Sequence, residues 1–318
     1  MISEKKSVAV EAARNPGSSV RVQTVLYRPG KGDVERLLRG LRHAVKVMKA
    51  DSPNVSFSVA FGDASPKATL TIDEVSVLSE EAKDFGVDEV TYDFFGRNLG
   101  SARGHNRLLT EFTEDFVLFL NPDVYMSPLA LTEMMLLSSD SSNGIVEARQ
   151  IPLEHPKSFD PDSGDTSWAS TAGALVRREV IEATEGFDPD SFFLYCDDVD
   201  LSWRARLAGF RVVHQPTAQI FHDKRLTTEA RMSVGDAEHY YAAEAALILA
   251  WKYSRPDLSE QWASEMEQST MEHQRNAAAE FRSRQAAGRL PAPIDSDGKV
   301  AQFVGTDFAQ HRFSYADA

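Results

Sequence analysis

The sequence predicts an α/β fold in which an open, mostly parallel sheet is flanked by helices and followed by a C-terminal helical extension. With 318 residues and 42% hydrophobic content, the chain can bury a large core in one large domain or two modest ones. From residue 20 onward, short apolar runs rich in β-branched residues alternate with amphipathic helical patterns. Alternation of this kind is typical of a parallel sheet covered on both faces.

The first half of the chain supplies strands and helices in turn. After a β-rich run at 20–27, Asp33 is expected to cap a helix with the apolar face Val34, Leu37, Leu38, Leu41, Val45 and Met48. The cycle then repeats, with strands expected at 55–61, 87–94 and 115–120 and helices at 72–85 and 99–112. The run at 115–120 is mostly apolar, which is typical of a strand buried on both faces.

The second half is less regular. Ser127 and Pro128 are expected to start a helix over 129–137, and an irregular stretch follows at 152–167, of a kind that often contributes to a binding site. The remaining elements expected here are a strand at 172–176, helices at 178–184 and 197–208, and short strands at 211–214 and 218–221. Gly209 is expected to end the helix at 197–208, because glycine favours the positive φ of that position.

The C-terminal part is expected to be helical. A helix around 240–253 ends before Pro256, and an increasingly polar helical stretch continues to residue 289. The first helix carries a stripe formed by Tyr241, Ala245, Ile248 and Lys252, which is expected to dock onto the core or onto a partner subunit in a homo-oligomer. The tail after residue 291 is expected to be mobile or to dock only locally.

Composition excludes several classes of partner. The formal net charge of −14 repels nucleic acid and anionic lipid. Cys196 is the single cysteine, which rules out an internal disulfide or a cysteine zinc site and suits a reducing cytoplasm. Residues 1–19 are polar, and no run approaches the ~20 apolar residues of a membrane span. A flexible leader, no transmembrane segment and a cytoplasmic location are therefore expected.

Acidic residues and a histidine follow the predicted strands. Ligands of open α/β sheets bind at the carboxyl ends of strands, where Asn121 and Asp123 follow the run 115–120. An acid held there suits a hard cation such as Mg²⁺ or Mn²⁺ that bridges a diphosphate. His222, just after the run 218–221, would complete a coordination shell with Asp123 and the diphosphate oxygens. Alone, Asp123 would more often be an ordinary turn aspartate, and His222 a surface or hydrogen-bonded histidine.

Three acids cluster at the start of the helix expected at 197–208. Asp197, Asp198 and Asp200 lie where the helix dipole favours anions, and Asp200 stands four residues before Arg204, so that pair is expected to form a salt bridge. A helix start needs one capping residue, so one of the two adjacent acids is expected to face a pocket. An ionised carboxylate there can accept the proton of a substrate hydroxyl.

These residues carry a family resemblance. The chain resembles glycosyltransferase family 2, in its rhamnosyltransferase-like bacterial branch with a GT-A fold, through an ordered set of segments over roughly 130 residues. The segments are 98–106, 119–124, 171–178, 185–188, 193–204 and 209–213, followed by His222. The resemblance divides the chain into a leader at 1–19, a nucleotide-sugar-binding half at 20–125, an acceptor-binding and catalytic half at 126–228, a helical extension at 229–290 and a tail at 291–318.

The resemblance also implies roles for individual residues. Asp123 and His222 would bind the Mn²⁺ or Mg²⁺ ion that holds the donor diphosphate, and Asp198 would be the general base of an inverting single displacement, with Asp197 as the alternative base. The donor is expected to be a UDP- or dTDP-sugar and the acceptor a carbohydrate or glycoconjugate, in polysaccharide or glycoconjugate synthesis. Donor contacts are expected from Tyr27, Asp63, Asn98, Gly100, Asn106 and Asn121. Acceptor contacts are expected from Trp168, Gly173, Ala174 and Tyr195.

The chain departs from the family pattern in its first third. The family usually has Thr-Tyr-Asn after the first strand and Asp-Asn-x-Ser after the second, whereas this chain has Leu-Tyr-Arg at 26–28 and Gly-Asp-Ala-Ser at 62–65. Gly62 thus stands where an acid that touches the nucleotide base is expected. Either Asp63 takes that role, or backbone groups read the base.

Two other functions stay open. A nucleotidyltransferase would need a glycine-rich loop with a basic residue after the first strand. Residues 29–32 resemble such a loop weakly, but they lack the arginines that bind a triphosphate in these enzymes. An inactive sugar-nucleotide-binding or scaffold protein is suggested by Gly62 and by the single acid of the segment around Asp123. The joint presence of Asp197, Asp198 and His222 favours an enzyme.

Overall fold

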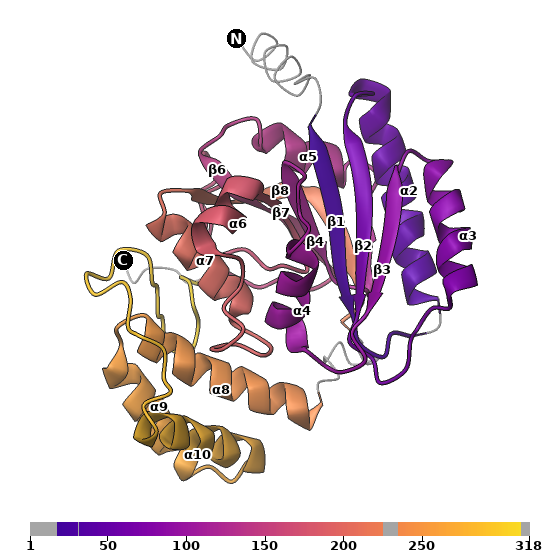
Figure 1. Cartoon of the computed structure of the whole chain (residues 1–318). Coiled ribbons are helices and arrows are strands. Elements are labelled where there is room, and N and C mark those ends of the chain that lie inside the picture. Colours follow the sequence, from indigo (N-terminus) through magenta and orange to yellow (C-terminus); the bar gives the residue numbers. More distant parts are fainter. Residues whose placement is uncertain (1–17, 31, 225–234, 313–318) are drawn as a thin grey trace.

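The computed structural model describes residues 18–30, 32–224 and 235–312 and contains one curled sheet with helices on both faces (Figure 1). The strand order is β3-β2-β1-β4-β7-β6-β8-β5. One face of the sheet packs against α2, α3 and α5, and the other packs against α4, α6 and α7. The leader predicted at 1–19 lies outside the described residues up to residue 17. The predicted α/β fold with flanking helices and a C-terminal helical extension is confirmed.

The first half is the parallel part of the sheet. β1 to β4 run parallel in the order β3-β2-β1-β4, as the alternating pattern predicts. All five residues of β4 are buried, because helices cover both of its faces. The strands are β1 (Ser19–Leu26), β2 (Ser56–Asp63), β3 (Glu89–Phe94) and β4 (Phe116–Leu120), and the helices are α2 (Asp33–Asp51), α3 (Ile72–Lys83) and α4 (Gly100–Leu109).

The second half mixes strand directions. β7 lies antiparallel to both β4 and β6, β6 runs parallel to β8, and β5 lies antiparallel to β8. The elements are β5 (Val124–Met126), α5 (Ala130–Leu137), β6 (Asn143–Ile151), β7 (Gly173–Arg177), α6 (Arg178–Thr184), α7 (Asp197–Leu207) and β8 (Arg211–His222). The strands expected at 211–214 and 218–221 are one strand, whose register against β6 shifts after Gln215. Pro216 lies in that irregularity, where no ladder hydrogen bond from its nitrogen is needed.

Two strands and two helix caps differ from the sequence expectation. β5 and β6 were not predicted: β5 is only three residues long, and the buried polar residues Glu147 and Gln150 interrupt the apolar pattern of β6. Asp33 is the first helical residue of α2 rather than its cap, because Gly32 takes the cap position with φ 87°. Ser127 makes no side-chain cap for α5. Gly209 ends α7 with φ 93°, as predicted.

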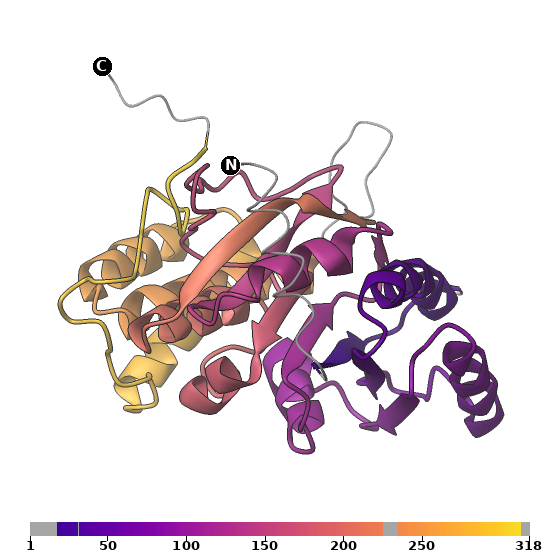
Figure 2. The same ribbon diagram turned by 90° about the horizontal axis from the view of Figure 1, so that it is seen from above.

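The C-terminal helices α8 (Asp236–Lys252), α9 (Pro256–Glu267) and α10 (Glu272–Ala286) form a bundle at the end of the molecule opposite α2 and α3 (Figure 2). Ala245 and Ile248 of the predicted stripe are buried. Lys252 Nζ lies 2.6 Å from Asp200 Oδ1 and 2.7 Å from Asp188 Oδ2. The stripe therefore docks onto the core of the same chain.

The tail docks as well, up to residue 312. The rings of Phe303 and Phe308 pack edge-on against Trp203 of α7, with centroids 5.3 and 6.4 Å away. Ser167 Oγ donates a hydrogen bond to the Phe308 carbonyl at 3.0 Å, and the Arg312 backbone nitrogen donates to the Pro156 carbonyl at 2.7 Å. The tail thus lies against the irregular stretch 152–167.

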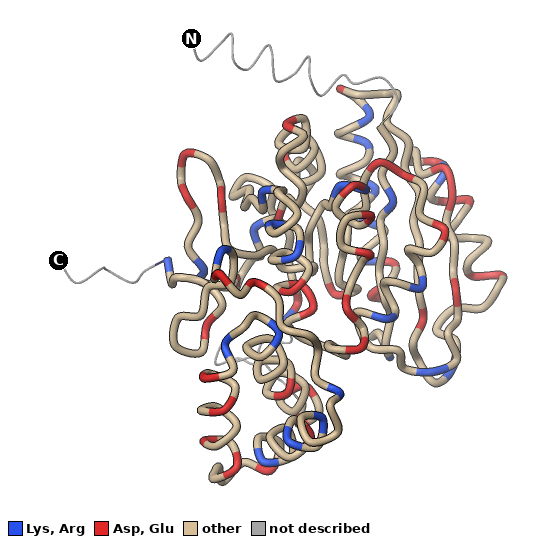
Figure 3. The backbone as a smooth tube through the Cα atoms, turned by 60° about the vertical axis from the view of Figure 1, so that its left-hand side comes forward, with Lys and Arg blue, Asp and Glu red and all other residues tan. Residues whose placement is uncertain are grey.

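Charged residues of both signs are interspersed along the described chain (Figure 3). In the C-terminal bundle they form ion pairs, such as that of Arg284 with Glu244 at 2.8 Å. No helix among the described residues is both long and apolar enough to cross a membrane.

Candidate functional site

The predicted site residues lie along one edge of the sheet. β4 is antiparallel to β7, β7 is antiparallel to β6, and β6 is parallel to β8. β4 and β8 therefore run in the same direction. The segment after β4 and the end of β8 therefore meet, and β5 joins them by pairing Val124 with His222. The ends of β1 and β2 point to the same edge.

Asp123, His222 and Asn121 are brought together there. His222 Nε2 lies 3.3 Å from Asp123 Oδ1 and 3.5 Å from the side-chain nitrogen of Asn121. On the other side of the ring, His222 Nδ1 lies 2.8 Å from Gln150 Oε1 of β6. An amide oxygen can only accept, so Nδ1 carries a proton, and Nε2 is the ring nitrogen that faces Asp123. Gln150 is a positioning residue that the sequence could not reveal while β6 was unrecognised.

The pair formed by Asp123 and His222 fits a divalent cation. Two ligands at right angles, each about 2.1 Å from a Mg²⁺ ion, lie about 3 Å apart, close to the 3.3 Å that separates Asp123 Oδ1 from His222 Nε2. Within the described residues, no group of three or more His, Cys, Asp and Glu side chains could hold a metal. The remaining ligands would therefore be diphosphate and water oxygens, which such ions accept readily.

Asp197 and Asp198 begin α7 but have different surroundings. Asp197 is 4% exposed, hydrogen-bonds with the Ser101 side chain, and has no described partner for Oδ2. Asp198 is partly exposed, and burial together with the adjacent Asp197 raises its pKa to about 7. Asp198 is therefore the more accessible carboxylate and the one whose pKa suits proton transfer near neutral pH.

Asp200 has a structural role. Its side chain is fully buried, and its carboxylate pairs with Arg204 at 2.7 Å and with Lys252 at 2.6 Å. The Tyr253 hydroxyl also donates a hydrogen bond to it, at 3.2 Å. The predicted salt bridge with Arg204 is confirmed, and the same carboxylate holds α8 against α7.

Lys157 is a neighbour of the site that the sequence did not single out. Its side chain is buried, with Nζ 2.7 Å from Glu147 Oε1 and 3.7 Å from the centre of the Trp168 ring. Burial opposes the charge of Glu147, but Lys157 and His214 lower the pKa of that carboxyl to about 2. The Lys157 cation also lowers the pKa of Asp198, against the raising effects of burial and Asp197. The only sequence signal was the irregular stretch 152–167, which was expected near a binding site.

Tyr27, Asn98 and Gly100 lie at the predicted donor edge. Tyr27 is 46% exposed after β1, with the Arg28 guanidinium 5.4 Å from its ring centre. Asn98 Oδ1 accepts a hydrogen bond from the Gly100 backbone at 3.0 Å. Gly100 has φ 72°, and a Cβ there would lie 2.2 Å from the carbonyl oxygen of Phe193. This turn therefore requires glycine and packs directly on the segment that leads into α7.

Gly62 has no room for an acidic side chain. A Cβ at this position would lie 2.3 Å from the Phe95 ring and 3.0 Å from Leu108. Phe95 is buried and its ring lies 4.7 Å from the Arg107 guanidinium carbon. The space that the family's acid would need is thus filled by an aromatic side chain.

Asp63 and Asn106 use their polar atoms within the protein. Asp63 is 0% exposed, and its carboxylate accepts hydrogen bonds from two backbone nitrogens of the following loop and from the Tyr92 hydroxyl. These hydrogen bonds outweigh burial and lower its pKa. Asn106 exchanges two hydrogen bonds with the backbone of Phe187, at 2.8 and 2.9 Å. Both residues shape the donor edge from inside.

The residues predicted for the acceptor separate into two groups. Trp168 is 7% exposed beneath Lys157, and Tyr195 is partly buried with φ 67° just before α7. Gly173 and Ala174 lie in β7 opposite β4, and Ala174 is 0% exposed in the core. Trp168 and Tyr195 belong to the cluster formed with α7 and α8, whereas Ala174 lies in the core of the sheet.

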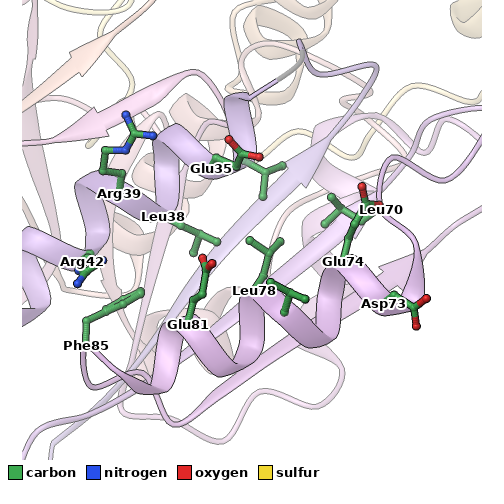
Figure 4. Close-up of a pocket in the computed structure, with 12 residues that line it drawn as sticks. Glu35, Leu38, Arg39, Arg42, Leu70, Asp73, Glu74, Leu78, Glu81 and Phe85 are labelled. Atoms are coloured by element: carbon green, nitrogen blue, oxygen red, sulfur yellow. The ribbon is translucent and has the colours of Figure 1, made fainter.

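A groove of about 570 Å³ lies elsewhere, between α2 and α3 (Figure 4). Its apolar floor includes Leu38, Leu78 and Phe85, and its rim carries charges of both signs such as Arg39 and Glu81. None of the predicted site residues lines it, so it does not belong to the site at the sheet edge.

Comparison with known proteins agrees with the resemblance. The model of the family described as "Glycosyltransferase like family 2" matches residues 156–234. An N-acetylglucosaminyl-diphospho-decaprenol L-rhamnosyltransferase of Mycobacterium tuberculosis is 24% identical over 180 residues, which are 42% of this chain and 58% of the relative. The rhamnosyltransferase WbbL of Escherichia coli is 25% identical over 139 residues, covering 34% of this chain and 52% of the relative. The chain thus spans little more than half the length of these relatives.

Solved structures share the fold. The mannosyltransferase PcManGT of Pyrobaculum calidifontis, in complex with GDP-Man and Mn²⁺, has a TM-score of 0.51 at 14% identity over 93% of this chain and 84% of its own. GalNAc-T7 with UDP, GalNAc and Mn²⁺ has a TM-score of 0.56 at 10% identity over 86% of this chain and 59% of its own. At these identities the likeness establishes the GT-A fold alone. Together with the family match, it confirms the resemblance to glycosyltransferase family 2.

Proposed function

We propose that this family 2-like chain is a metal-dependent, inverting glycosyltransferase that moves a sugar from a nucleotide-diphosphate donor to an acceptor hydroxyl. One observation carries the proposal: His222 Nε2 and Asp123 Oδ1 lie 3.3 Å apart in a geometry that fits a divalent cation, in a chain that also holds a carboxylate, Asp198, whose pKa is raised to about 7. Asp198 and the Asp123–His222 pair are linked through charged neighbours. Lys157 lowers the pKa of Asp198, and both Lys157 and Asp123 act on the pKa of Lys224.

The proposed chemistry is a single displacement. Asp198 accepts the proton of the acceptor hydroxyl while the hydroxyl oxygen attacks the anomeric carbon of the donor sugar. The bond from that carbon to the diphosphate breaks, and the nucleoside diphosphate leaves with the electron pair. Attack on the face opposite the leaving group inverts the anomeric configuration. Asp123 and His222 would hold a Mn²⁺ or Mg²⁺ ion, which when bound neutralises the charge that develops on the leaving group.

The substrates follow from the relatives and from the site. The proposed donor is a UDP- or dTDP-sugar and the proposed acceptor a carbohydrate or glycoconjugate, within polysaccharide or glycoconjugate synthesis. The two relatives named as rhamnosyltransferases support transfer of a sugar. Tyr27, Asn98 and Asn121 are proposed to face the donor, and Trp168 and Tyr195 the acceptor. A cytoplasmic location is part of the proposal, supported by the single cysteine.

The base assignment is tested by Asp198→Asn. We expect transfer to fall by about 10²–10⁴-fold, the usual contribution of a general base, while calorimetry shows unchanged binding of the nucleotide sugar. Asp190→Asn is the matched control, because Asp190 is 87% exposed and pairs only with Arg103. An unchanged transfer rate in Asp198→Asn would sink the base assignment.

Loss of folding can be excluded in the same variant. The pKa of Asp198 is raised in the folded chain, so the folded state binds more protons than the unfolded state between pH 4 and pH 7. Its ionisation therefore lowers the free energy of unfolding as pH rises through this window. We expect Asp198→Asn to melt at a higher temperature than the wild type above pH 7, although its activity is lost.

Product analysis separates the proposal from its alternatives. A thermal-shift panel of nucleotide sugars, with and without Mn²⁺, identifies the donor, and Asp123→Ala should abolish the metal-dependent part of the shift. Release of nucleoside diphosphate from that donor supports transfer. Release of pyrophosphate from a nucleoside triphosphate would indicate a nucleotidyltransferase, and donor binding without turnover would indicate an inactive binding protein.

A further inference from the structure

Aromatic side chains from three separate parts of the chain gather at the donor edge. Tyr27 follows β1 and is 46% exposed. Phe193 precedes α7, and Tyr241 belongs to α8 of the C-terminal extension. The rings of Phe193 and Tyr241 stack with centroids 4.6 Å apart and an interplanar angle of 30°.

This stack is attached to the predicted donor turn. The Ser101 backbone nitrogen donates a hydrogen bond to the Phe193 carbonyl at 2.9 Å. A Cβ on Gly100 would lie 2.8 Å from the Phe193 ring, so the ring rests on the turn that Asn98 stabilises. Tyr241 reaches the same turn through Phe193, on whose ring it stacks. Burial, Glu244 and Tyr27 raise the pKa of its hydroxyl. The Tyr241 hydroxyl therefore lies within electrostatic range of Tyr27.

The neighbouring tyrosine of α8 has a different hydroxyl partner. Burial, Glu244 and Glu280 raise the pKa of Tyr240 to about 12, and its hydroxyl bonds to Glu244. Glu280 and Arg284 belong to α10, and Arg284 holds Glu244 at 2.8 Å. The ring of Tyr240 meets that of Tyr241 edge-on, with centroids 5.1 Å apart, and so supports the stacked ring from the side of the bundle.

We infer that Tyr241, stacked on Phe193, forms with Tyr27 an aromatic cleft that holds the planar base of the nucleotide donor. The inference rests on the proposed function and adds to it a residue of the C-terminal extension as a donor contact. It also accounts for Gly62. Phe95 fills the space in which an acid would hydrogen-bond one edge of the nucleotide base, so the base would be bound by ring stacking instead. Because every base has a π face, stacking tolerates different bases.

The test is binding of UDP and of inorganic pyrophosphate by calorimetry, in Mn²⁺, with the full chain. Tyr241→Ala should weaken UDP binding about tenfold, within the range measured for losing one stacked aromatic ring, and leave pyrophosphate binding unchanged. Tyr241→Phe keeps the ring and should stay within about threefold of the wild type. Tyr240→Phe is the matched control: it removes the hydroxyl that bonds to Glu244, keeps the ring that meets Tyr241, and should bind UDP as the wild type does. GDP and dTDP should bind the wild type within about tenfold of UDP.

Every other outcome overturns either the aromatic cleft or the proposed function. Equal weakening of UDP and pyrophosphate by Tyr241→Ala, unchanged UDP binding in that variant, or a tenfold loss in Tyr241→Phe would each overturn the aromatic cleft. Melting temperatures of the variants exclude unfolding as the cause, and Tyr241→Leu, which fills the space without a ring, should reproduce the loss if Tyr241→Ala fails to fold. A wild-type chain that binds no nucleoside diphosphate overturns the proposed function itself.

Discussion

The parallel half of the sheet and the half that carries the proposed base are built on different principles. In β1 to β4 the core is mainly apolar, with Gln23, Thr24 and Asp63 as buried polar exceptions, and the core residues of α2 face it at helical spacing. Around β6 and β8, ionisable groups are buried in contact with one another: Glu147 is 3% exposed, Lys157 6% and His214 4%. The comparison teaches that the first half is stabilised mainly by apolar burial, whereas the second half also depends on a buried ion pair.

The largest expected effect breaks a buried pair. Glu147→Gln leaves the Lys157 ammonium buried without its partner, so we expect the free energy of unfolding to fall by about 3–5 kcal/mol, measured by urea denaturation. The double variant Glu147→Gln with Lys157→Met removes both charges and should recover much of that loss. If the double variant is as unstable as the sum of the singles, the pair does not stabilise this half in the way described.

The pH dependence of transfer tests the difference between the two halves at Asp198, the proposed general base. Asp198 must be ionised to accept a proton, and its pKa is about 7, so kcat/KM should rise with pH, pass its midpoint near 7 and level off above. Lys157→Met removes a cation that lowers this pKa, and the midpoint should therefore move to higher pH. Lys252→Met, at another buried lysine, is the control: a shift of the same size there would assign the effect to general destabilisation.

A smaller effect is expected from the apolar half. Gly62→Ala places a Cβ 2.3 Å from the Phe95 ring, and overpacking of this kind costs about 1–3 kcal/mol. Thermal unfolding should show the loss, and Phe95→Leu in the same chain should restore part of it. An alanine variant as stable as the wild type would mean that the ring moves without cost, leaving room for an acid at this position.

The smallest effect concerns a helix end at the surface. The Thr71 hydroxyl accepts a hydrogen bond from the Glu74 backbone nitrogen at 3.2 Å, and Glu74 reaches back to the Thr71 nitrogen at 2.8 Å. Thr71→Ala should lower the free energy of unfolding by ~1 kcal/mol. Transfer should be unchanged, because α3 contributes no residue to the proposed site.

The same contrast explains what could be predicted from the sequence. The strands and helices of the first half follow hydrophobic periodicity, and all were predicted to within a few residues. β6 was missed because Glu147 and Gln150 interrupt its apolar pattern, although both are buried against His214 and His222, which lie 67 and 72 residues further along the chain. For the site, sequence motifs identified Asp123 and His222, which lie together, and Asp198, whose role as the base stays a prediction. They could not reveal Gln150, Lys157 or Tyr241, whose positions depend on tertiary packing.

The docked tail has a consequence for the order in which the protein matures. Arg312 donates hydrogen bonds to the carbonyl of Lys157, 155 residues earlier in the chain, and its guanidinium pairs with Glu154. During synthesis, β1 to β3 emerge together with α2 and α3, which pack against them. The contacts of the stretch that carries Lys157 are complete only once residues 308–312 have been made. We therefore expect the first three strands and their helices to be able to pack before the stretch 152–167 is fixed in place.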